Sequence, residues 1–316
     1  MRIVFMGAAE LSCPSLQALL ERRGDAVVAV VCPPDRPQGR RLRPAPCPAK
    51  RAAAAAGAPV LTPADVNAPE SVAALRALRP DVIVVVAYGQ ILKAELLALP
   101  PLGGVNIHAS LLPRYRGAAP VQWAIANGET VTGVTAMKMA ARLDAGEILL
   151  QEEEPIAPED TGGTLQARLA AAGAALLMRA LDGLRDGTLR GRPQDERLAS
   201  YAPKLRKEDG RVDWTLPAPR IHDRVRAFDP WPGSYCLLPG GGRTLKLLAT
   251  RPEPGQGRPG RVLGVSEAGP LVAAGEGAVR LLRVQPEGRR AMSGADFVRG
   301  RALAPGDVLG GEEGGR

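Results

Sequence analysis

Residues 82–87 read Val-Ile-Val-Val-Val-Ala, a continuous run of mostly β-branched residues with the length of a strand. Such a run is typical of a strand whose two faces are both buried, as in a parallel sheet covered by helices. Similar runs occupy Ile3 to Met6 and Val27 to Cys32, and helical patterns lie between the runs at Ser15 to Arg22 and Pro69 to Leu78. This alternation predicts an α/β fold with a doubly wound, mostly parallel sheet.

The second half of the chain changes in pattern. A helical pattern from Thr164 to about Leu184 closes the first region, and a polar, basic, proline-interrupted stretch follows. Beyond it lie five short apolar runs separated by glycine-rich turns: Ser234 to Leu238, Thr244 to Ala249, Gly260 to Val265, Leu271 to Ala274 and Val279 to Val284. These runs indicate a small all-β barrel or sandwich, and a barrel of the oligonucleotide-binding (OB) type would match the basic charge of the second half.

Four segments are therefore predicted. They are an α/β domain over 1–189, a basic linker over 190–208, an OB-like β-barrel domain over 209–305, and a disordered tail over 306–316. The tail is assigned to disorder because it contains five glycines at the end of the chain.

Composition limits the class of protein. With 45% hydrophobic and 23% charged residues among 316, the chain is too apolar to be disordered throughout. No apolar run is long enough to cross a bilayer and the first residues do not form a signal peptide, so we expect a cytoplasmic protein. The formal net charge is +8, and residues 35–51 contain six basic side chains against one acidic. This excess favours a polyanionic partner such as a nucleic acid.

The sequence argues against two kinds of cofactor. The four cysteines are widely spaced without a Cys-x-x-Cys pair and there are only two histidines, so we predict no metal site. The turn after the first strand reads Gly7-Ala8-Ala9-Glu10 and lacks the further glycines that would let the backbone wrap a dinucleotide pyrophosphate.

The stretch Gly103 to Gly117, GGVNIHASLLPRYRG, concentrates polar groups at the end of an apparent strand. Asn106 and His108 would project from one face of that strand, with Val105 and Ile107 on the other. A pair of hydrogen-bonded polar side chains in the core would give the same spacing. The position at a strand end, followed by an Arg-rich loop, favours a functional site.

A third polar group comes from another predicted strand end. After the strand Gly133 to Met139, the segment Leu143-Asp144-Ala145-Gly146 carries one carboxylate among small residues. Taken by itself, Asp144 is more typical of an ordinary turn former. We interpret it as a site residue only in combination with Asn106 and His108.

These polar residues and the segments around them resemble the motifs of a known family. The set Asn106-x-His108 with Leu143-Asp144-Ala145-Gly146, and the segment SLLPRYRGAAP from Ser110, resemble the formyltransferases that use 10-formyltetrahydrofolate. Within that superfamily, further matches resemble the methionyl-tRNA formyltransferases and run through nearly the whole chain. They are residues 34–40, 85–89, 159–161, 201–204, 213–214, 226–232 and 291–293.

The resemblance implies the reaction and the roles of the site. The expected activity is transfer of the formyl group from 10-formyltetrahydrofolate to the free α-amine of methionine on initiator tRNA, by a monomer. Asn106 and His108 would stabilise the oxyanion of the tetrahedral intermediate, Asp144 would take the proton of the attacking amine, and His108 would protonate the departing folate nitrogen. Six residues would line the folate site: Tyr88, Gly89, Ser110, Leu111, Leu112 and Pro113.

The same resemblance assigns the basic segments to tRNA. The loop 33–48 contains six prolines and is long for a connection, and in the family it enters the tRNA acceptor arm. The predicted tRNA contacts in this loop and in the linker are Arg36, Arg40, Arg41, Arg43, Lys204, Arg206 and Lys207.

Two alternatives remain open at the level of sequence. One is a folate-dependent formyltransferase acting on a sugar-nucleotide amine, which would use the same Asn-x-His and Asp groups but has no need of the basic insertion at 33–48. The other is a noncatalytic RNA-binding protein, which would have no need to retain Asn106, His108 and Asp144.

Overall fold

The computed structural model describes residues 1–38, 43–240, 242–300 and 303–310. The chain forms two compact units. Unit 1 comprises Met1–Pro120, Val131–Pro155 and Gln166–Ala202. Unit 2 comprises Val121–Thr130, Ile156–Leu165 and Pro203–Arg316. The sequence predicted a single boundary at residue 189, but the units do not divide there. Unit 1 continues to Ala202, and two short segments before residue 189 belong to unit 2.

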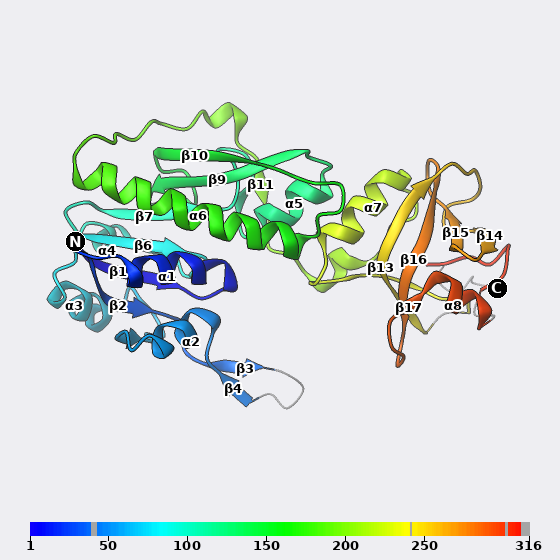
Figure 1. The fold of residues 1–316 in the computed structure, drawn as a ribbon, viewed down its shortest axis with the longest axis horizontal. Helices are drawn as coiled ribbons and strands as arrows, with labels where there is room; N and C mark the ends of the chain where they lie inside the picture. Colours follow the sequence, from blue (N-terminus) through cyan, green and yellow to red (C-terminus); the bar gives the residue numbers. More distant parts are fainter. Residues whose placement is uncertain (39–42, 241, 301–302, 311–316) are drawn as a thin grey trace. The chain divides into compact units, whose positions relative to one another are not determined.

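Unit 1 is built on a seven-stranded sheet with the order β10-β9-β7-β6-β1-β2-β5 (Figure 1). The strands are β1 (Arg2–Gly7), β2 (Ala26–Val31), β5 (Val60–Leu61), β6 (Val82–Val86), β7 (Gly104–His108), β9 (Val131–Lys138) and β10 (Ile148–Pro155). The five strands from β7 to β5 run parallel, whereas β9 and β10 are antiparallel to their neighbours. The predicted doubly wound, mostly parallel sheet is therefore confirmed.

Helices cover both faces of this sheet. They are α1 (Cys13–Glu21), α2 (Pro48–Ala55), α3 (Pro69–Ala77), α4 (Ala94–Leu97) and α6 (Gly162–Arg185), with 3-10 turns η1 (Glu10–Ser12) and η2 (Glu196–Leu198). The long α6 crosses the sheet in Figure 1, and a Cβ on its Gly173 would lie only 2.8 Å from Ile107 of β7. On the opposite face, Leu75 of α3 packs with Ile83 of β6. None of the described helices is long and apolar enough to span a bilayer.

Two small strand pairs complete unit 1. β3 (Arg36–Gln38) and β4 (Arg43–Ala45) form an antiparallel pair within the basic loop, which the sequence did not predict. β8 (Arg116–Gly117) pairs in parallel with β11 (Tyr201–Ala202). Because β11 lies within the predicted linker 190–208, the first part of that stretch is paired structure of unit 1 rather than a free connection.

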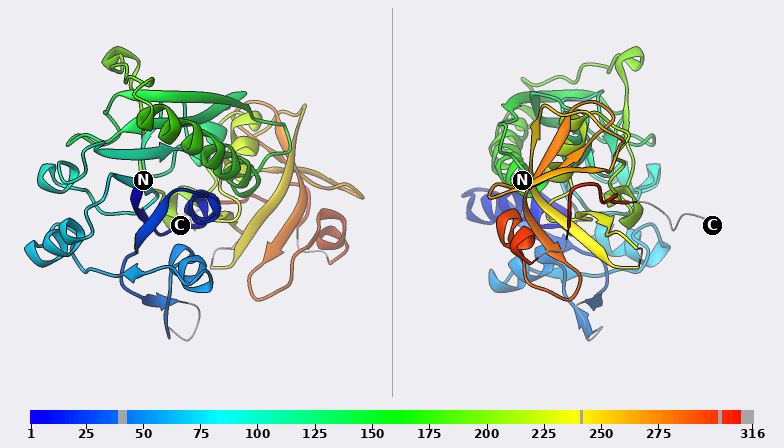
Figure 2. Two further views of the ribbon diagram at one scale, coloured as in Figure 1. Left: turned by 60° about the vertical axis from the view of Figure 1, so that its left-hand side comes forward. Right: turned by 90° about the vertical axis from the view of Figure 1, so that its right-hand side faces the viewer.

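Unit 2 contains an antiparallel sheet with the order β12-β13-β16-β15-β14, and β17 pairs with β16. Its strands are β12 (Ser234–Leu237), β13 (Thr244–Glu253), β14 (Val262–Ser266), β15 (Gly269–Ala273), β16 (Ala278–Pro286) and β17 (Met292–Ser293). The helices of this unit are α5 (Pro120–Ala126), α7 (Ala218–Ala227) and α8 (Gly294–Arg299), with the turn η3 (Lys207–Gly210). Figure 2 shows β13 and β16 as long, curved neighbours. The predicted C-terminal β domain is confirmed, and no pairing of β12 with β14 closes it among the described residues.

The predicted disordered tail is wrong for residues 306–310. Leu309 is only 2% exposed and belongs to the hydrophobic core of unit 2, together with Trp214 and Phe297. Its amide donates to the carbonyl of Gly260, and the amide of Gly310 donates to Leu237. Burial of one leucine and pairing of the backbone outweigh the flexibility that glycine gives this segment. Residues 311–316 lie outside the described part of the chain.

Candidate active site

Asn106 and His108 lie at the carboxyl end of β7, in the middle of the sheet. The pairing places Asn106 beside Val85 of β6 and Met137 of β9, and it places His108 beside Thr135. The two side chains share the face opposite Ile107, as the strand alternation predicted. Asn106 is 9% exposed and His108 is 6% exposed, so both residues are largely buried at the carboxyl end of the strand.

The two ring nitrogens of His108 face acceptor groups. Nε2 lies 2.9 Å from the carbonyl oxygen of Tyr115, and because a carbonyl only accepts, Nε2 is the donor. Nδ1 lies 3.7 Å from Oδ2 of Asp144, which is ion-pair distance rather than hydrogen-bond distance. The imidazole is thus oriented from both sides, by a backbone group and by a carboxylate.

Asp144 is held by the backbone of the loop that follows His108. Its Oδ2 accepts from the amide of Gly117 at 2.8 Å, and the side chain is 10% exposed. The residue itself has φ +48°, a conformation that is uncommon for residues other than glycine. The turn between β9 and β10 therefore aims the carboxylate back toward β7.

The carboxamide of Asn106 differs from its neighbours because no group among the described residues is hydrogen-bonded to it. Within the described part of the chain no hydrogen bond joins it to another group, although nine-tenths of the residue is buried. Its side-chain oxygen and nitrogen are not among the fully buried polar atoms that lack a partner in the described residues, so the carboxamide reaches the surface of the site. Its donors are consequently available to a bound molecule.

Backbone strain collects in the loops around these groups. Among the described residues, four that are not glycine have positive φ: Arg79, Ala87, Tyr115 and Asp144. Ala87 follows β6, Tyr115 supplies the carbonyl bonded to His108, and Asp144 supplies the carboxylate. Left-handed conformations at such residues cost about 1–3 kcal/mol each and cluster at functional sites.

The segment after His108 is braced from β9 and β10. The hydroxyl of Thr135 donates to the carbonyl of Ser110 and accepts from the amide of Leu112, and Gln151 donates to the Leu112 carbonyl. Ser110 is fully buried, and its hydroxyl donates to the carbonyl of Arg114.

The two leucines of the predicted folate segment have different surroundings. Leu112 is 3% exposed and packs with Met137 and Ile148 in a small core cluster. Leu111 and Pro113 are half-buried. Leu112 is therefore part of the hydrophobic core. Of the two leucines predicted to line the folate site, Leu111 is the one with accessible apolar surface.

Tyr88 and Gly89 follow β6, next to the point where the strand order reverses between β6 and β1. The amide of Ala8, after β1, donates to the carbonyl of Ala87 across this point. Tyr88 is 3% exposed, and its hydroxyl is buried without a hydrogen-bond partner in the described residues. Burial raises the pKa of this phenol to about 12, so Tyr88 is a neutral donor at physiological pH. Ligands of open α/β sheets bind at such a reversal of strand order.

Sequence reasoning missed a set of residues behind the Asp144 turn. Gln194 donates from Nε2 to the carbonyls of Asp144 and Gly146, both at 2.8 Å, and accepts from the guanidinium of Arg116. Arg116 is fully buried and also pairs with Glu196. Gln194 is 50 residues from Asp144 and lies in a stretch that the sequence assigned to a linker, so local pattern gave no signal for it.

The predicted tRNA contacts are divided between the units. Arg36 and Arg43 lie on the β3 and β4 pair of unit 1 and are exposed, whereas Arg40 and Arg41 are outside the described residues. Lys204, Arg206 and Lys207 belong to unit 2 and are exposed. The base of the loop is held by an ion pair between Lys50 and Asp35 at 2.7 Å.

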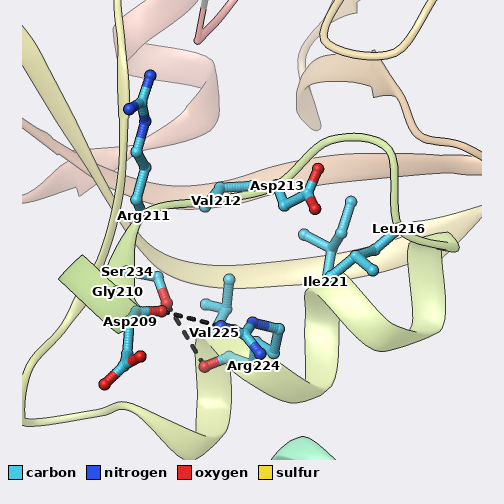
Figure 3. Close-up of a pocket in the computed structure, with 10 residues that line it drawn as sticks. All are labelled: Asp209, Gly210, Arg211, Val212, Asp213, Leu216, Ile221, Arg224, Val225 and Ser234. Carbon is cyan, nitrogen blue, oxygen red and sulfur yellow. Dashed lines mark hydrogen bonds between the residues drawn. The ribbon is translucent and has the colours of Figure 1, made fainter. Parts of the chain in front are cut away.

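A small cavity in unit 2 contains none of the predicted site residues. Figure 3 shows it between η3, α7 and the start of β12, where Arg224 donates to the carbonyl of Asp209 and Ser234 donates to the carbonyl of Arg224. Its volume is about 10 Å³, room for one water molecule at most. This cavity is therefore too small for a substrate.

The sequence is similar to formyl transferases over nearly its whole length. Two family models match, "Formyl transferase" over residues 1–181 and "Formyl transferase, C-terminal domain" over residues 204–302. The methionyl-tRNA formyltransferase of Geobacter metallireducens is 47% identical, with 98% of each chain covered. That of Moorella thermoacetica is also 47% identical and covers 98% of this chain and 99% of its own.

Solved structures share the fold at lower identity. WlaRD, described as a sugar 3N-formyl transferase, has a TM-score of 0.65 at 17% identity over 92% of this chain and 99% of its own. HypX from Aquifex aeolicus in complex with tetrahydrofolic acid has a TM-score of 0.60 at 22% identity over 96% of this chain and 47% of its own. These structures show the shared fold, whereas the two family models and the 47%-identical relatives confirm the family that the Asn-x-His and Asp motifs indicated. The chain belongs to the formyl transferase family.

Proposed function

We propose that this protein transfers the formyl group of 10-formyltetrahydrofolate to the α-amine of methionine on initiator tRNA. The observation that carries the proposal is the convergence of Asn106, His108 and Asp144 at one strand end, in a chain 47% identical to methionyl-tRNA formyltransferases over 98% of its length. The protein would act as a monomer in the cytoplasm, where tRNA is aminoacylated.

The chemistry needs a group that stabilises negative charge. Attack of the amine nitrogen on the formyl carbon gives a tetrahedral intermediate whose oxygen is anionic. The carboxamide of Asn106, which has no hydrogen-bond partner among the described residues, supplies donors to this oxygen, and donors aimed at a developing negative charge lower the energy of the intermediate. Nε2 of His108 is committed to the carbonyl of Tyr115, so Nδ1, which lies beyond hydrogen-bond distance from Asp144, is the nitrogen that would donate to the same region when the ring is protonated.

Two protons must move before the bond from carbon to the folate nitrogen breaks. Asp144 takes the proton of the attacking amine, directly or through water, and His108 delivers a proton to the departing nitrogen. The neutral amine is accessible because a free α-amino group has a pKa of about 7.7–8.0. A carboxylate 3.7 Å from the imidazole is placed to balance the charge that His108 gains and loses.

The loops after β6 and β7 fit the folate. Leu111 offers apolar surface, and a Cβ at Gly89 would meet no atom within 4 Å, so the backbone there is open to a ligand, whereas the hydroxyl of Tyr88 is enclosed by the protein. Pterin rings combine a flat apolar body with polar edges, and such ligands bind in mostly apolar clefts with a few oriented polar groups.

An amine-acceptor assay tests the proposal. We expect the protein to transfer the formyl group from 10-formyltetrahydrofolate to methionyl initiator tRNA, with no comparable transfer to free methionine or to a UDP-amino sugar. Radiolabelled formyl groups followed into each acceptor provide the measurement. Preferential labelling of the amino sugar would reject tRNA as the substrate, and no transfer to any acceptor would reject enzymatic activity.

The basic loop provides a second test, directed at the tRNA. Reversing the charge of Arg36 and Arg43 together (R36E/R43E) should raise KM for the tRNA by about 10-fold and leave KM for the folate unchanged, because phosphate contacts are lost. The slope of log kcat/KM against log salt concentration should fall by about 0.7 for each contact removed. Steady-state kinetics at several salt concentrations measure both effects.

A matched control separates local contacts from total charge. The variant R23E/R76E makes the same change of charge at two exposed arginines of unit 1 outside the loop. Its KM for tRNA should stay within about twofold, since distant surface charges are screened by salt. Equal effects in both double variants, or none in R36E/R43E, would contradict the role of the loop.

A further inference from the structure

The turn that carries Asp144 is held from behind by one amide side chain. Gln194 donates to the carbonyl of Asp144 and to the carbonyl of Gly146, both at 2.8 Å. One NH₂ group thus bonds to the turn on both sides of Ala145. Asp144 has positive φ, and a Cβ on Gly146 would lie 1.7 Å from the carbonyl of Lys138. The turn is therefore both strained and closely packed, and Gln194 links its residues Asp144 and Gly146 through their carbonyl groups.

Gln194 is itself anchored in the interior. Its Oε1 accepts from Nη2 and Nε of Arg116 at 2.7 and 3.1 Å. Arg116 is fully buried, and it also pairs with Glu196, at 3.0 Å. The guanidinium needs acceptors because a buried, unpaired charge is costly. Oε1 is thus committed to Arg116, and the NH₂ group of Gln194 is oriented toward the turn.

The chain also connects this anchor to the backbone that holds the carboxylate. Arg116 is followed by Gly117, whose amide donates to Oδ2 of Asp144 at 2.8 Å. Through Arg116 and Gln194, the backbone of the Asp144 turn and the amide that binds its carboxylate are tied to one buried guanidinium. A shift of either would move the carboxylate relative to His108, now 3.7 Å away.

We propose that Gln194 is a positioning residue for formyl transfer, which holds the Asp144 carboxylate against His108 by bonding the backbone of the turn. The inference rests on the proposed role of Asp144 in proton transfer. Gln194 contacts neither substrate nor reacting atoms in this scheme. Because proton transfer is sensitive to displacement of about 1 Å, the effect belongs to kcat rather than to substrate binding.

The variant Q194E isolates this function. A glutamate keeps the size of the side chain and an acceptor for Arg116, but it replaces the two donors by an acceptor facing two carbonyls. We expect kcat to fall by about 10- to 100-fold while KM for tRNA and for folate changes by less than about threefold. The midpoint of urea unfolding, measured in parallel, should remain near that of the parent.

The neighbouring variant E196Q is the matched control. It weakens the ion pairs that Glu196 makes with Arg116 and with the exposed Arg142, and it leaves the bonds from Gln194 to Asp144 and Gly146 in place. Glu196 is about half exposed, so its kcat should stay within about threefold of the parent. A loss in E196Q as large as that in Q194E would assign the effect to the Arg116 anchor and overturn the proposal.

A double-variant cycle with D144N separates this inference from the proposed function. If Gln194 acts through Asp144, Q194E should cost little further activity in the D144N background. Additive losses would assign Gln194 a general structural role and overturn the proposal, as would an unchanged kcat in Q194E with D144N strongly impaired. Retained activity in D144N alone would instead reject the role of Asp144 itself.

Discussion

Replacing Asn106 with alanine is expected to lower kcat/KM for formyl transfer by about 10²- to 10³-fold, the usual effect of removing one donor to an oxyanion. The carboxamide makes no hydrogen bond within the described part of the chain, so the substitution removes no bond of the described fold, and we expect its effect to fall on the proposed reaction. Most of the loss should appear in kcat, because the charge on the oxygen develops only along the reaction. Single-turnover transfer to methionyl-tRNA measures it directly.

The stability of the same variant distinguishes chemistry from folding. Since the substitution removes no hydrogen bond seen among the described residues, the free energy of unfolding should change by less than about 1 kcal/mol. The isosteric variant N106D keeps the shape but places a negative charge where the oxyanion forms, so it should be at least as impaired. If N106A retains near-parental kcat/KM, Asn106 does not stabilise the oxyanion.

Replacing Gly146 with alanine is expected to displace the Asp144 turn. The added Cβ would lie 1.7 Å from the carbonyl oxygen of Lys138 and 2.8 Å from its carbon, and neither backbone atom can rotate away. Overpacking of this kind costs about 1–3 kcal/mol of unfolding free energy. Because Gly146 is two residues from Asp144, kcat should fall by about 10²-fold through misplacement of the carboxylate. Urea unfolding and steady-state kinetics together measure the two effects.

Gly264 provides the matched glycine. It lies in β14 of unit 2, and a Cβ there would meet no atom within 4 Å. G264A should therefore change the unfolding free energy by no more than about 0.5 kcal/mol and leave kcat unaltered. Parental activity and stability in G146A would show that the turn accommodates a side chain and would remove the geometric basis of the prediction.

The buried strands were predictable because both of their faces are covered. The run Val82 to Ala87 corresponds to β6 (Val82–Val86), all of whose residues are buried. Alternation along β7 placed Asn106 and His108 on one face for the same reason, since side chains of a strand alternate by geometry alone. The burial of a strand and the face on which its side chains lie can therefore be predicted from residues that are neighbours in the sequence.

The elements that the sequence missed depend on distant partners. β8 consists of Arg116 and Gly117 and exists because Tyr201 and Ala202 pair with it. Similarly, Leu309 sits in a glycine-rich terminus whose pattern indicates disorder, and it is ordered by the core of unit 2. Neither interaction has a local signal, because propensity describes a segment without its tertiary neighbours.

The sequence by itself determined the mostly parallel sheet, the family, and the three polar groups proposed for the chemistry. Only the tertiary structure decided that Asp144 lies 3.7 Å from His108, that Leu112 belongs to the core, and that Gln194 holds the turn. The division has a physical reason. Strand periodicity and motif spacing are properties of neighbouring residues, whereas the orientation of a carboxylate is set by hydrogen bonds to groups brought together only when the chain folds.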